Sequence, residues 1–134
     1  MTDARPVAVK HAYRALVVED DPAIRRLVEK LLTRLKIDID LASDGRTAID
    51  KLRAQHYSVL VLDLMVPELN GFEIIDVIKE ENLNVPVAVV SAVSQQALTR
   101  LDLDVVKLVI SKPFDVDEFT KAILELCAEA EGHA

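Results

Sequence analysis

Five side chains that suit metal or phosphoryl chemistry each come at the end of a short apolar run. Glu19 and Asp20 follow "RALVV", and Asp63 follows "YSVLVL". Ser91 follows "VPVAVV", and Lys112 follows "VKLVIS". An ionised carboxylate at the end of a buried run is costly unless a partner compensates its charge. The five residues therefore predict one composite site, provided that the runs end at the same edge of a sheet.

The chemistry of such a site follows from its charges. Three adjacent carboxylates repel one another, and desolvation raises their pKa values unless a cation lies between them. Mg²⁺ meets this need, because it binds one or two carboxylates together with waters and phosphate oxygens. One carboxylate can then attack phosphorus and form an acyl phosphate. Lys112 and the metal would neutralise the transferring phosphoryl group, and Ser91 could donate a hydrogen bond to it.

Apolar periodicity predicts the elements that position these residues. Strands are expected over 14–20, 37–42, 57–63, 85–92 and 106–111. Helices are expected over 21–35, 43–54, 71–81, 94–101 (short) and 115–130. Strands that alternate with helices form βα units and a parallel sheet with helices on both faces. We therefore predict a single doubly wound α/β domain, in which ligands bind beyond the carboxyl ends of the strands.

Length and composition limit the classes of protein. A chain of 134 residues, 51% hydrophobic and 29% charged, suits one globular domain. We expect a flexible leader over 1–13, a domain over 14–130 and a short tail over 131–134. The formal charge of −7 argues against direct binding of nucleic acid. Cys127 is the single cysteine, no apolar run approaches the roughly 18 residues of a membrane span, and no signal peptide is evident, so we expect a cytoplasmic protein.

Four motifs, in this order, carry a resemblance to a known family. They are "VVEDD" at the first strand, "DLMVPELNG" after the third, "SA" after the fourth and "KPF" after the fifth. From about Arg14 to about Leu126 the chain resembles the receiver domain of bacterial two-component response regulators, and it is similar to the single-domain chemotaxis type. The resemblance implies a flavodoxin-like sheet of five parallel strands in the order 2-1-3-4-5.

The resemblance also implies a role for each residue of the site. Asp63 would be the phosphoacceptor. Asp20 would bind Mg²⁺ directly, Glu19 would complete the acidic pocket through a water, and the backbone carbonyl of Met65 would be a further metal ligand. Ser91 would be the switch hydroxyl that follows the phosphoryl group.

The same resemblance gives roles to Lys112, Pro67 and Gly71. Lys112 would pair with the phosphoryl group, and the Lys112–Pro113 bond would be cis. Pro67 and Gly71 would shape the loop after the phosphoacceptor. Apart from the resemblance, Arg25 and Arg26 are expected on the solvated face of the helix over 21–35, where docking to a kinase is one role open to them.

The chain departs from the family pattern between the fourth and fifth strands. Val109 replaces the usual aromatic residue three positions before the lysine, and the usual Gly-Ala turn is missing from "LDLDVVKLVI". This segment is therefore expected to be irregular. Met65 and Val93, each two residues after a site residue, are apolar, and in the family such positions flank the path of the hydrolytic water. Exclusion of that water predicts slow self-dephosphorylation.

The implied function is signalling, in which the protein catalyses only its own phosphorylation and slow dephosphorylation. The donor would be a histidine kinase, a histidine phosphotransfer protein or a small acyl or amidophosphate. Output would pass through contact with a downstream protein target, without nucleic acid or membrane insertion. The oligomeric state stays open, and the chain is either a stand-alone regulator or a piece of a longer protein.

Three alternatives have different requirements. A phosphatase of the haloacid dehalogenase type needs a second Asp two residues after the first, where this chain has Met65. A flavodoxin-like nucleotide or flavin binder holds phosphate on a Gly- or Ser/Thr-rich turn, whereas the turn "EDDPA" repels phosphate. A pseudo-receiver that binds partners without phosphorylation has normally lost an acid or the lysine, and this chain keeps Glu19, Asp20, Asp63 and Lys112.

Overall fold

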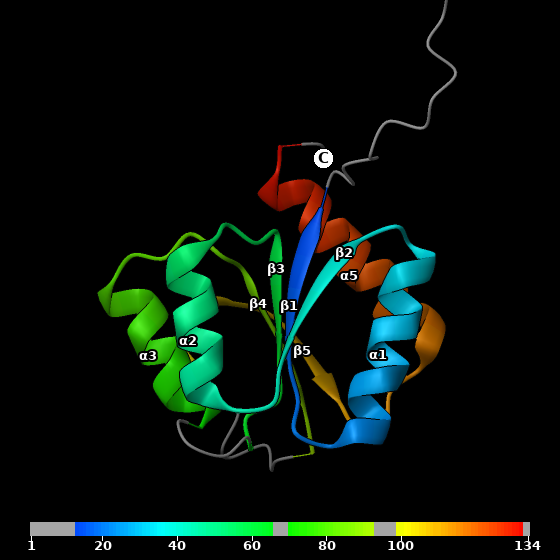
Figure 1. The fold of residues 1–134 in the computed structure, drawn as a ribbon, viewed down its shortest axis with the longest axis horizontal. Helices are drawn as coiled ribbons and strands as arrows, with labels where there is room; N and C mark the ends of the chain where they lie inside the picture. The colour runs from blue at the N-terminus through cyan, green and yellow to red at the C-terminus, as the bar shows by residue number, and fades with distance from the viewer. Residues whose placement is uncertain (1–12, 66–69, 93–98, 133–134) are drawn as a thin grey trace, which may run out of the picture.

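Five parallel strands form one sheet in the order β2-β1-β3-β4-β5 (Figure 1), as predicted. The structure is a computed structural model, and it describes residues 13–65, 70–92 and 99–132. The strands are β1 (Arg14–Val18), β2 (Asp38–Ala42), β3 (Val59–Leu62), β4 (Val87–Ser91) and β5 (Val106–Ser111). Because the chain reverses its direction of winding after β2, strands β1 and β3 are neighbours. This reversal is where a doubly wound sheet places its ligand site.

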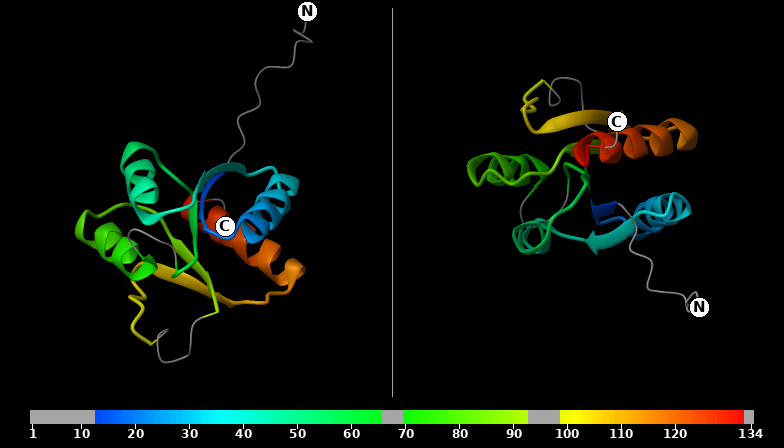
Figure 2. Two further views of the ribbon diagram at one scale, coloured as in Figure 1. Left: turned by 60° about the horizontal axis from the view of Figure 1, so that its bottom comes forward. Right: turned by 90° about the horizontal axis from the view of Figure 1, so that it is seen from above.

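Helices cover both faces of the sheet. They are α1 (Pro22–Arg34), α2 (Gly45–Ala54), α3 (Gly71–Glu80) and α5 (Val116–Ala130). Helices α1 and α5 lie on one face, and α2 and α3 lie on the other (Figures 1 and 2). Among the described residues, we find no helix with the length and apolarity that crossing a membrane requires.

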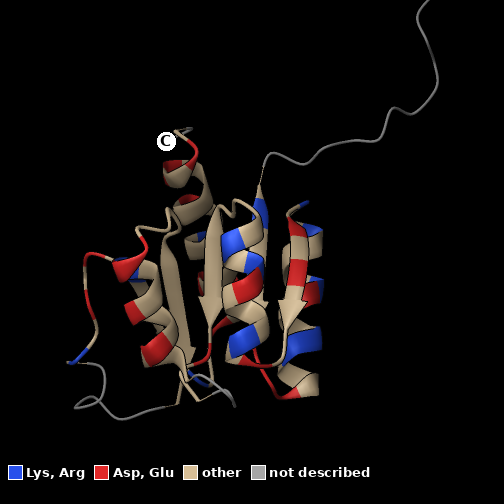
Figure 3. Ribbon diagram, turned by 60° about the vertical axis from the view of Figure 1, so that its left-hand side comes forward, with Lys and Arg blue, Asp and Glu red and all other residues tan. Residues whose placement is uncertain are grey.

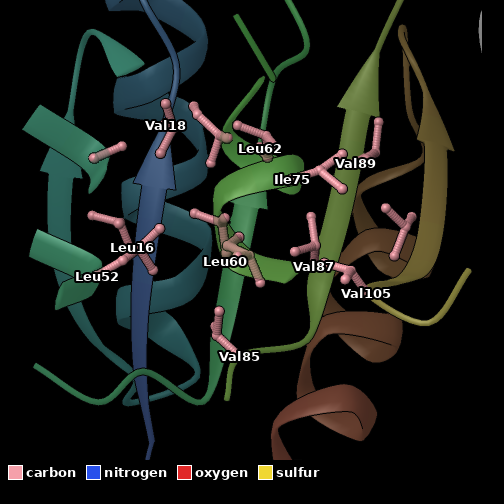
Figure 4. Close-up of a cluster of buried hydrophobic side chains, with 14 of the residues drawn as sticks. Leu16, Val18, Leu52, Leu60, Leu62, Ile75, Val85, Val87, Val89 and Val105 are labelled. Atoms are coloured by element: carbon pink, nitrogen blue, oxygen red, sulfur yellow. The ribbon is translucent and has the colours of Figure 1, made fainter. Parts of the chain in front are cut away.

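The sheet separates two hydrophobic clusters, because successive side chains of a strand point to opposite faces. Leu16 and Val18 of β1 join the cluster under α2 and α3 (Figure 4), whereas Val17 joins the cluster under α1 and α5. Every residue of β3 and β4 is buried. This burial on both faces explains the nearly continuous apolar runs in the sequence.

Local caps begin the helices that flank the carboxyl edge of the sheet. The carboxylate of Asp21 accepts hydrogen bonds from the N–H groups of Ala23 and Ile24 and so caps the N-terminus of α1. Asn70 and Glu73 form a capping box that begins α3 directly after the loop that follows β3. These caps fix where the loops near Asp63 end.

The predicted elements differ from the observed ones mainly at their ends. The predicted strand over 57–63, for example, is reduced to β3 (Val59–Leu62), although the N–H groups of Ser58 and Asp63 at its two ends still donate to backbone oxygens of β1. Most of the predicted helix over 94–101 lies outside the described residues, and its last residues, 99–101, form a turn and a bend rather than a helix. Residues 1–12 of the predicted leader over 1–13 and residues 133–134 of the predicted tail also lie outside the described residues, so the domain boundaries stay predictions.

The chain before β5 is irregular, as its sequence predicts. The carbonyl oxygen of Asp102 accepts hydrogen bonds from the N–H groups of both Val105 and Val106, which closes the turn without glycine. The pairing of β4 with β5 then shifts register between Val87 and Ala88. Val109, at the position where the family usually has an aromatic residue, is 40% exposed on this edge strand.

Candidate functional site

The ends of β1 and β3 bring the three predicted carboxylates together. Val18 and Leu62 are register partners, and the N–H of Asp63 donates to the carbonyl oxygen of Val18 at 3.0 Å. Ligand oxygens of Glu19, Asp20 and Asp63 all lie within 4.8 Å of one another. Figure 3 shows acidic chain leaving the edge of the sheet toward which the strand arrows point. The expected juxtaposition of strand-end carboxylates is therefore present.

The three carboxylates differ in their access to solvent. Glu19 is 4% exposed and Asp63 is 8% exposed, whereas Asp20 is exposed. The charges of Glu19 and Asp63 are thus partly removed from water, and the repulsion between two charges is stronger away from water. The open side at Asp20 leaves room for a cation to approach. Oxygen ligands in this arrangement fit a hard divalent ion such as Mg²⁺.

Lys112 joins this cluster from the end of β5. Its Nζ donates to Oε1 of Glu19 at 2.7 Å and lies 3.4 Å from Oδ2 of Asp63. Its backbone N–H donates to the carbonyl oxygen of Ser91, and its bond to Pro113 is cis, as expected. The ammonium group is therefore closer to Glu19 than to the Asp63 carboxylate.

Burial and charge act in opposite directions on the two partners of this ion pair. Burial lowers the pKa of Lys112, but its hydrogen bond to Glu19 and the charges of Asp63 and Glu19 raise that pKa more. Burial raises the pKa of Glu19, the hydrogen bond from Lys112 lowers it, and Asp63 raises it further, so the net shift is upward. Lys112 is thus firmly protonated and supplies positive charge to a crowded anionic site.

The loop after β3 orients Asp63. The N–H of Met65 donates to Oδ1 of Asp63 at 3.1 Å, while the Met65 side chain is 67% exposed. Gly71 N–H donates to the carbonyl oxygen of Leu64 at 2.9 Å. A Cβ on Gly71 would lie 2.6 Å from the Cα of Leu64, so this close approach requires glycine. Pro67, predicted to shape the same loop, lies outside the described residues, as does Val93.

Ser91 is at the end of β4, the strand between β3 and β5 in the sheet. It is 4% exposed, and its register partner is Ser111 on β5. The sheet therefore brings all five predicted residues to one edge. Ser91 is the last residue of β4, which lies next to β3, and Lys112 directly follows β5, which lies next to β4.

Arg25 is a contact of this site that the sequence interpretation missed. It was expected on the solvated face of α1, but it is half-buried, and its Nη1 donates to the carbonyl oxygen of Glu19 at 3.0 Å. Its neighbour Arg26 is exposed, as expected. The available signal was its position four residues after the N-cap Asp21, because helix side chains point back toward the N-terminus.

Comparison with known proteins identifies the family. Residues 15–124 match the family described as "Response regulator receiver domain". The chain belongs to this family. Receiver domains are signalling modules of two-component systems rather than conventional enzymes, and they take a phosphoryl group on an aspartate. They interact with histidine kinases and downstream effectors.

Curated relatives share this receiver domain within longer proteins. Response regulator ArlR of Staphylococcus epidermidis is 32% identical over 110 residues, which cover 81% of this chain and 49% of the relative. Sensor protein EvgS of Escherichia coli K12 is 32% identical over 83 residues, which cover 62% of this chain and 7% of the relative. The receiver chain spans about half the length of the ArlR relatives that it matches.

Two solved receiver structures have closely similar folds. The receiver domain of Francisella response regulator 1452 has a TM-score of 0.81 and 27% identity, covering 87% of this chain and 98% of that one. Response regulator TrrA of Thermotoga maritima, in complex with Mg²⁺ and BeF, has a TM-score of 0.76 and 26% identity, covering 85% and 98%.

Proposed function

We propose that this receiver accepts a phosphoryl group on Asp63 in a Mg²⁺-dependent reaction. The observation that carries the proposal is a buried Asp63 carboxylate beside two further acids and the ammonium group of Lys112. A carboxylate in this setting is held in place and available as a nucleophile. A pseudo-receiver has normally lost an acid or the lysine, whereas this chain keeps all three acids and Lys112.

The residues around Asp63 would divide the work of the transfer. The N–H of Met65 holds Oδ1 and Lys112 lies near Oδ2, so the carboxylate keeps one orientation as the donor approaches. A carboxylate oxygen of Asp63 attacks phosphorus and forms a new P–O bond. The bond from phosphorus to the donor breaks, and its electron pair leaves with the donor. Lys112 then neutralises negative charge on the phosphoryl oxygens.

The residues that would hold Mg²⁺ are Glu19, Asp20, Asp63 and the backbone carbonyl of Met65. The carboxylates offer only oxygen ligands, which is the donor set that Mg²⁺ prefers, and their mutual repulsion favours occupation by a cation. When bound, Mg²⁺ would neutralise charge that develops on the phosphoryl group. The complex of TrrA with Mg²⁺ and BeF supports this assignment by relationship.

Ser91 would stabilise the product. Its position at the end of β4 places it beside the strand that carries Asp63, where its hydroxyl would donate a hydrogen bond to a phosphoryl oxygen. Because Val109 is not aromatic, movement of Ser91 would not be coupled to an aromatic ring at that position of β5.

The donor would be a histidine kinase or a histidine phosphotransfer protein, and output would pass to a downstream protein target. Small acyl or amidophosphates would serve as donors in vitro. We place the protein in the cytoplasm, because the single cysteine, Cys127, is a free and buried thiol, which suits a reducing compartment. The net charge of −7 argues against direct contact with nucleic acid.

Intact-mass spectrometry tests the proposed reaction. The protein is incubated with MgCl₂ and acetyl phosphate or phosphoramidate, and a mass gain of one phosphoryl group is expected. EDTA and the substitution Asp63→Asn should each abolish the gain, whereas Asp76→Asn, at an exposed position of α3, should not. Absence of the gain in the native sequence, or its survival in Asp63→Asn, would contradict the proposal.

A further inference from the structure

The side chain of Arg25 extends from α1 back to the loop after β1, which carries Glu19 and Asp20. Its Nη1 donates to the carbonyl oxygen of Glu19 at 3.0 Å and lies 3.5 Å from the carbonyl oxygen of Asp20. The guanidinium group thus binds the backbone of the loop. Arg26, the next residue, is exposed and belongs to the solvated side of the helix.

The acidic loop is under electrostatic stress that such a contact opposes. Glu19 and Asp20 carry adjacent negative charges that face Asp63, and their repulsion favours spreading of the loop. The loop has other anchors as well. The N–H of Glu19 donates to the carbonyl oxygen of Ala42 at 3.1 Å, and the Glu19 carboxylate accepts hydrogen bonds from Nζ of Lys112 at 2.7 Å and from the N–H of Asp21 at 3.3 Å. A charge-assisted hydrogen bond from a guanidinium is stronger than one between neutral groups. Arg25 therefore adds a strong anchor on the carbonyl side of the loop.

We propose that Arg25 is a positioning residue for the metal ligands Glu19 and Asp20. The inference rests on the proposed function, because it gives Arg25 a part in building the Mg²⁺ site. The guanidinium bonds to peptide carbonyls, so it fixes the direction in which both side chains leave the backbone. Because Arg25 bonds to the backbone, it does not itself occupy the carboxylate oxygens of Glu19 and Asp20. Ligands that are already ordered bind more tightly, because less freedom is lost when the ion arrives.

The sign of the effect separates positioning from charge. The positive guanidinium group repels a Mg²⁺ ion that binds nearby, so removal of its charge alone would strengthen Mg²⁺ binding. Removal of the anchor would instead let the two ligands move and weaken Mg²⁺ binding. A decrease in affinity on substitution therefore reports positioning and opposes the direction that simple electrostatics predicts.

The test measures Mg²⁺ affinity without any phosphoryl chemistry. Thermal unfolding of the full chain, freed of metal with EDTA and dialysed, is followed over a series of MgCl₂ concentrations, and the dependence of Tm on concentration yields Kd. Arg25→Gln removes the charge and the fork of donors, and Arg25→Lys keeps the charge and a single donor. Arg26→Gln is the matched control, because it removes the same charge from an exposed neighbour.

Arg25→Gln should weaken Mg²⁺ binding about tenfold, the lower end of the losses seen when a partner that orients a metal ligand is removed. Arg25→Lys should recover part of the affinity, because an ammonium group can still donate to one carbonyl. Arg26→Gln should not weaken binding. A purely structural role would lower Tm equally with and without Mg²⁺ and would leave Kd unchanged.

An unchanged or tighter Kd in Arg25→Gln overturns the inference. If Arg25→Gln does not fold, Arg25→Lys decides, and an affinity equal to that of the native sequence overturns it. Failure here is distinct from failure of the proposed function. If the native protein binds Mg²⁺ and gains a phosphoryl group but Arg25→Gln has an unchanged Kd, only the role of Arg25 is disproved. If the native protein does not bind Mg²⁺, both the role of Arg25 and the proposed function are disproved.

Discussion

At the scale of single residues, Lys112 holds its ammonium group between two buried carboxylates. Nζ is 2.7 Å from Oε1 of Glu19 and 3.4 Å from Oδ2 of Asp63. A buried charge that loses its partner is left with the full cost of its desolvation. The lysine therefore contributes to the stability of the metal-free protein as well as to the proposed chemistry.

Lys112→Ala should lower the free energy of unfolding by about 2 kcal/mol in EDTA at pH 7, because it leaves Glu19 buried without its cation. Mg²⁺ should restore part of this loss, since the ion supplies the missing positive charge. Urea denaturation with and without MgCl₂ measures both effects, and Lys121→Ala, at an exposed position of α5, is the control. An equal response to Mg²⁺ in Lys112→Ala and the native sequence would show that the lysine does not have this role.

Met65 and Val93 are expected to slow hydrolysis of the acyl phosphate. Polar groups at these positions would help to orient the attacking water, so Met65→Asn together with Val93→Glu should raise the rate of dephosphorylation. The measurement is the decay of the phosphorylated mass after removal of the donor. A control with Met65→Leu keeps the position apolar and should decay at a rate close to that of the native sequence. An unchanged rate in the double variant would show that these side chains do not control access of water.

The sequence predicts the members of the site better than their contacts. Glu19, Asp63 and Lys112 are predictable because strand ends of a parallel sheet meet at one edge. The preference of Lys112 for Glu19 over Asp63 depends on side-chain reach, which spacing does not reveal. Arg25 was missed because helical periodicity assigns it to the solvent face, whereas its long side chain turns back past the N-cap.

At the scale of elements, the junction of β3 and α3 depends on close packing at Gly71. A Cβ there would lie 2.6 Å from the Cα and 2.8 Å from Cδ2 of Leu64, and 3.2 Å from the carbonyl oxygen of Asp63. The first residue of α3 is thus in direct contact with the chain that carries the proposed phosphoacceptor. Any movement of this junction would move Asp63.

Gly71→Ala should destabilise the protein by about 2 kcal/mol, because the backbone must shift to admit the methyl group. The sign is informative, since replacement of Gly by Ala in a helix is normally stabilising. The variant should also gain a phosphoryl group more slowly from acetyl phosphate. Asp76→Ala, at an exposed position of the same helix, is the control. A Gly71→Ala protein as stable as the native sequence would contradict the close approach.

Predicted and observed elements agree where apolar periodicity is strong and differ where the conformation of a turn sets the end of an element. The fully buried strands β3 and β4 and the capped helix α1 are recognisable because their signals are local. The segment before β5 is less predictable. It lacks glycine and closes through the carbonyl oxygen of Asp102, which sequence spacing does not reveal.

At the scale of the whole molecule, the alternation of strands and helices in the sequence is enough to predict the fold class. The strand order β2-β1-β3-β4-β5 brings the five site residues to one edge of the sheet: Glu19, Asp20, Asp63, Ser91 and Lys112. Cys127, fully buried between α5 and the sheet, belongs to the core that supports this edge. Its titration provides a test of that core.

Burial raises the pKa of the Cys127 thiol from 9.0 to about 12, and the charge of Glu131 adds to the effect. Above pH 9 the unfolded chain therefore loses this proton while the folded chain keeps it, and stability falls as pH rises. Relative to Cys127→Ala, the native sequence should lose about 1 kcal/mol of unfolding free energy between pH 7 and pH 10. Urea denaturation of both proteins at the two pH values measures the difference, and a difference independent of pH would contradict the burial of the thiol.

The central claim is that Asp63 carries the phosphoryl group, and borohydride trapping tests it most directly. Borohydride reduces an acyl phosphate to an alcohol, so a phosphorylated aspartate becomes homoserine at a position that peptide sequencing by mass spectrometry identifies. After incubation with MgCl₂ and phosphoramidate, we predict homoserine at position 63 and unchanged residues at Glu19 and Asp20. Homoserine at another acidic position, or none at all in a protein that binds Mg²⁺, would contradict the claim.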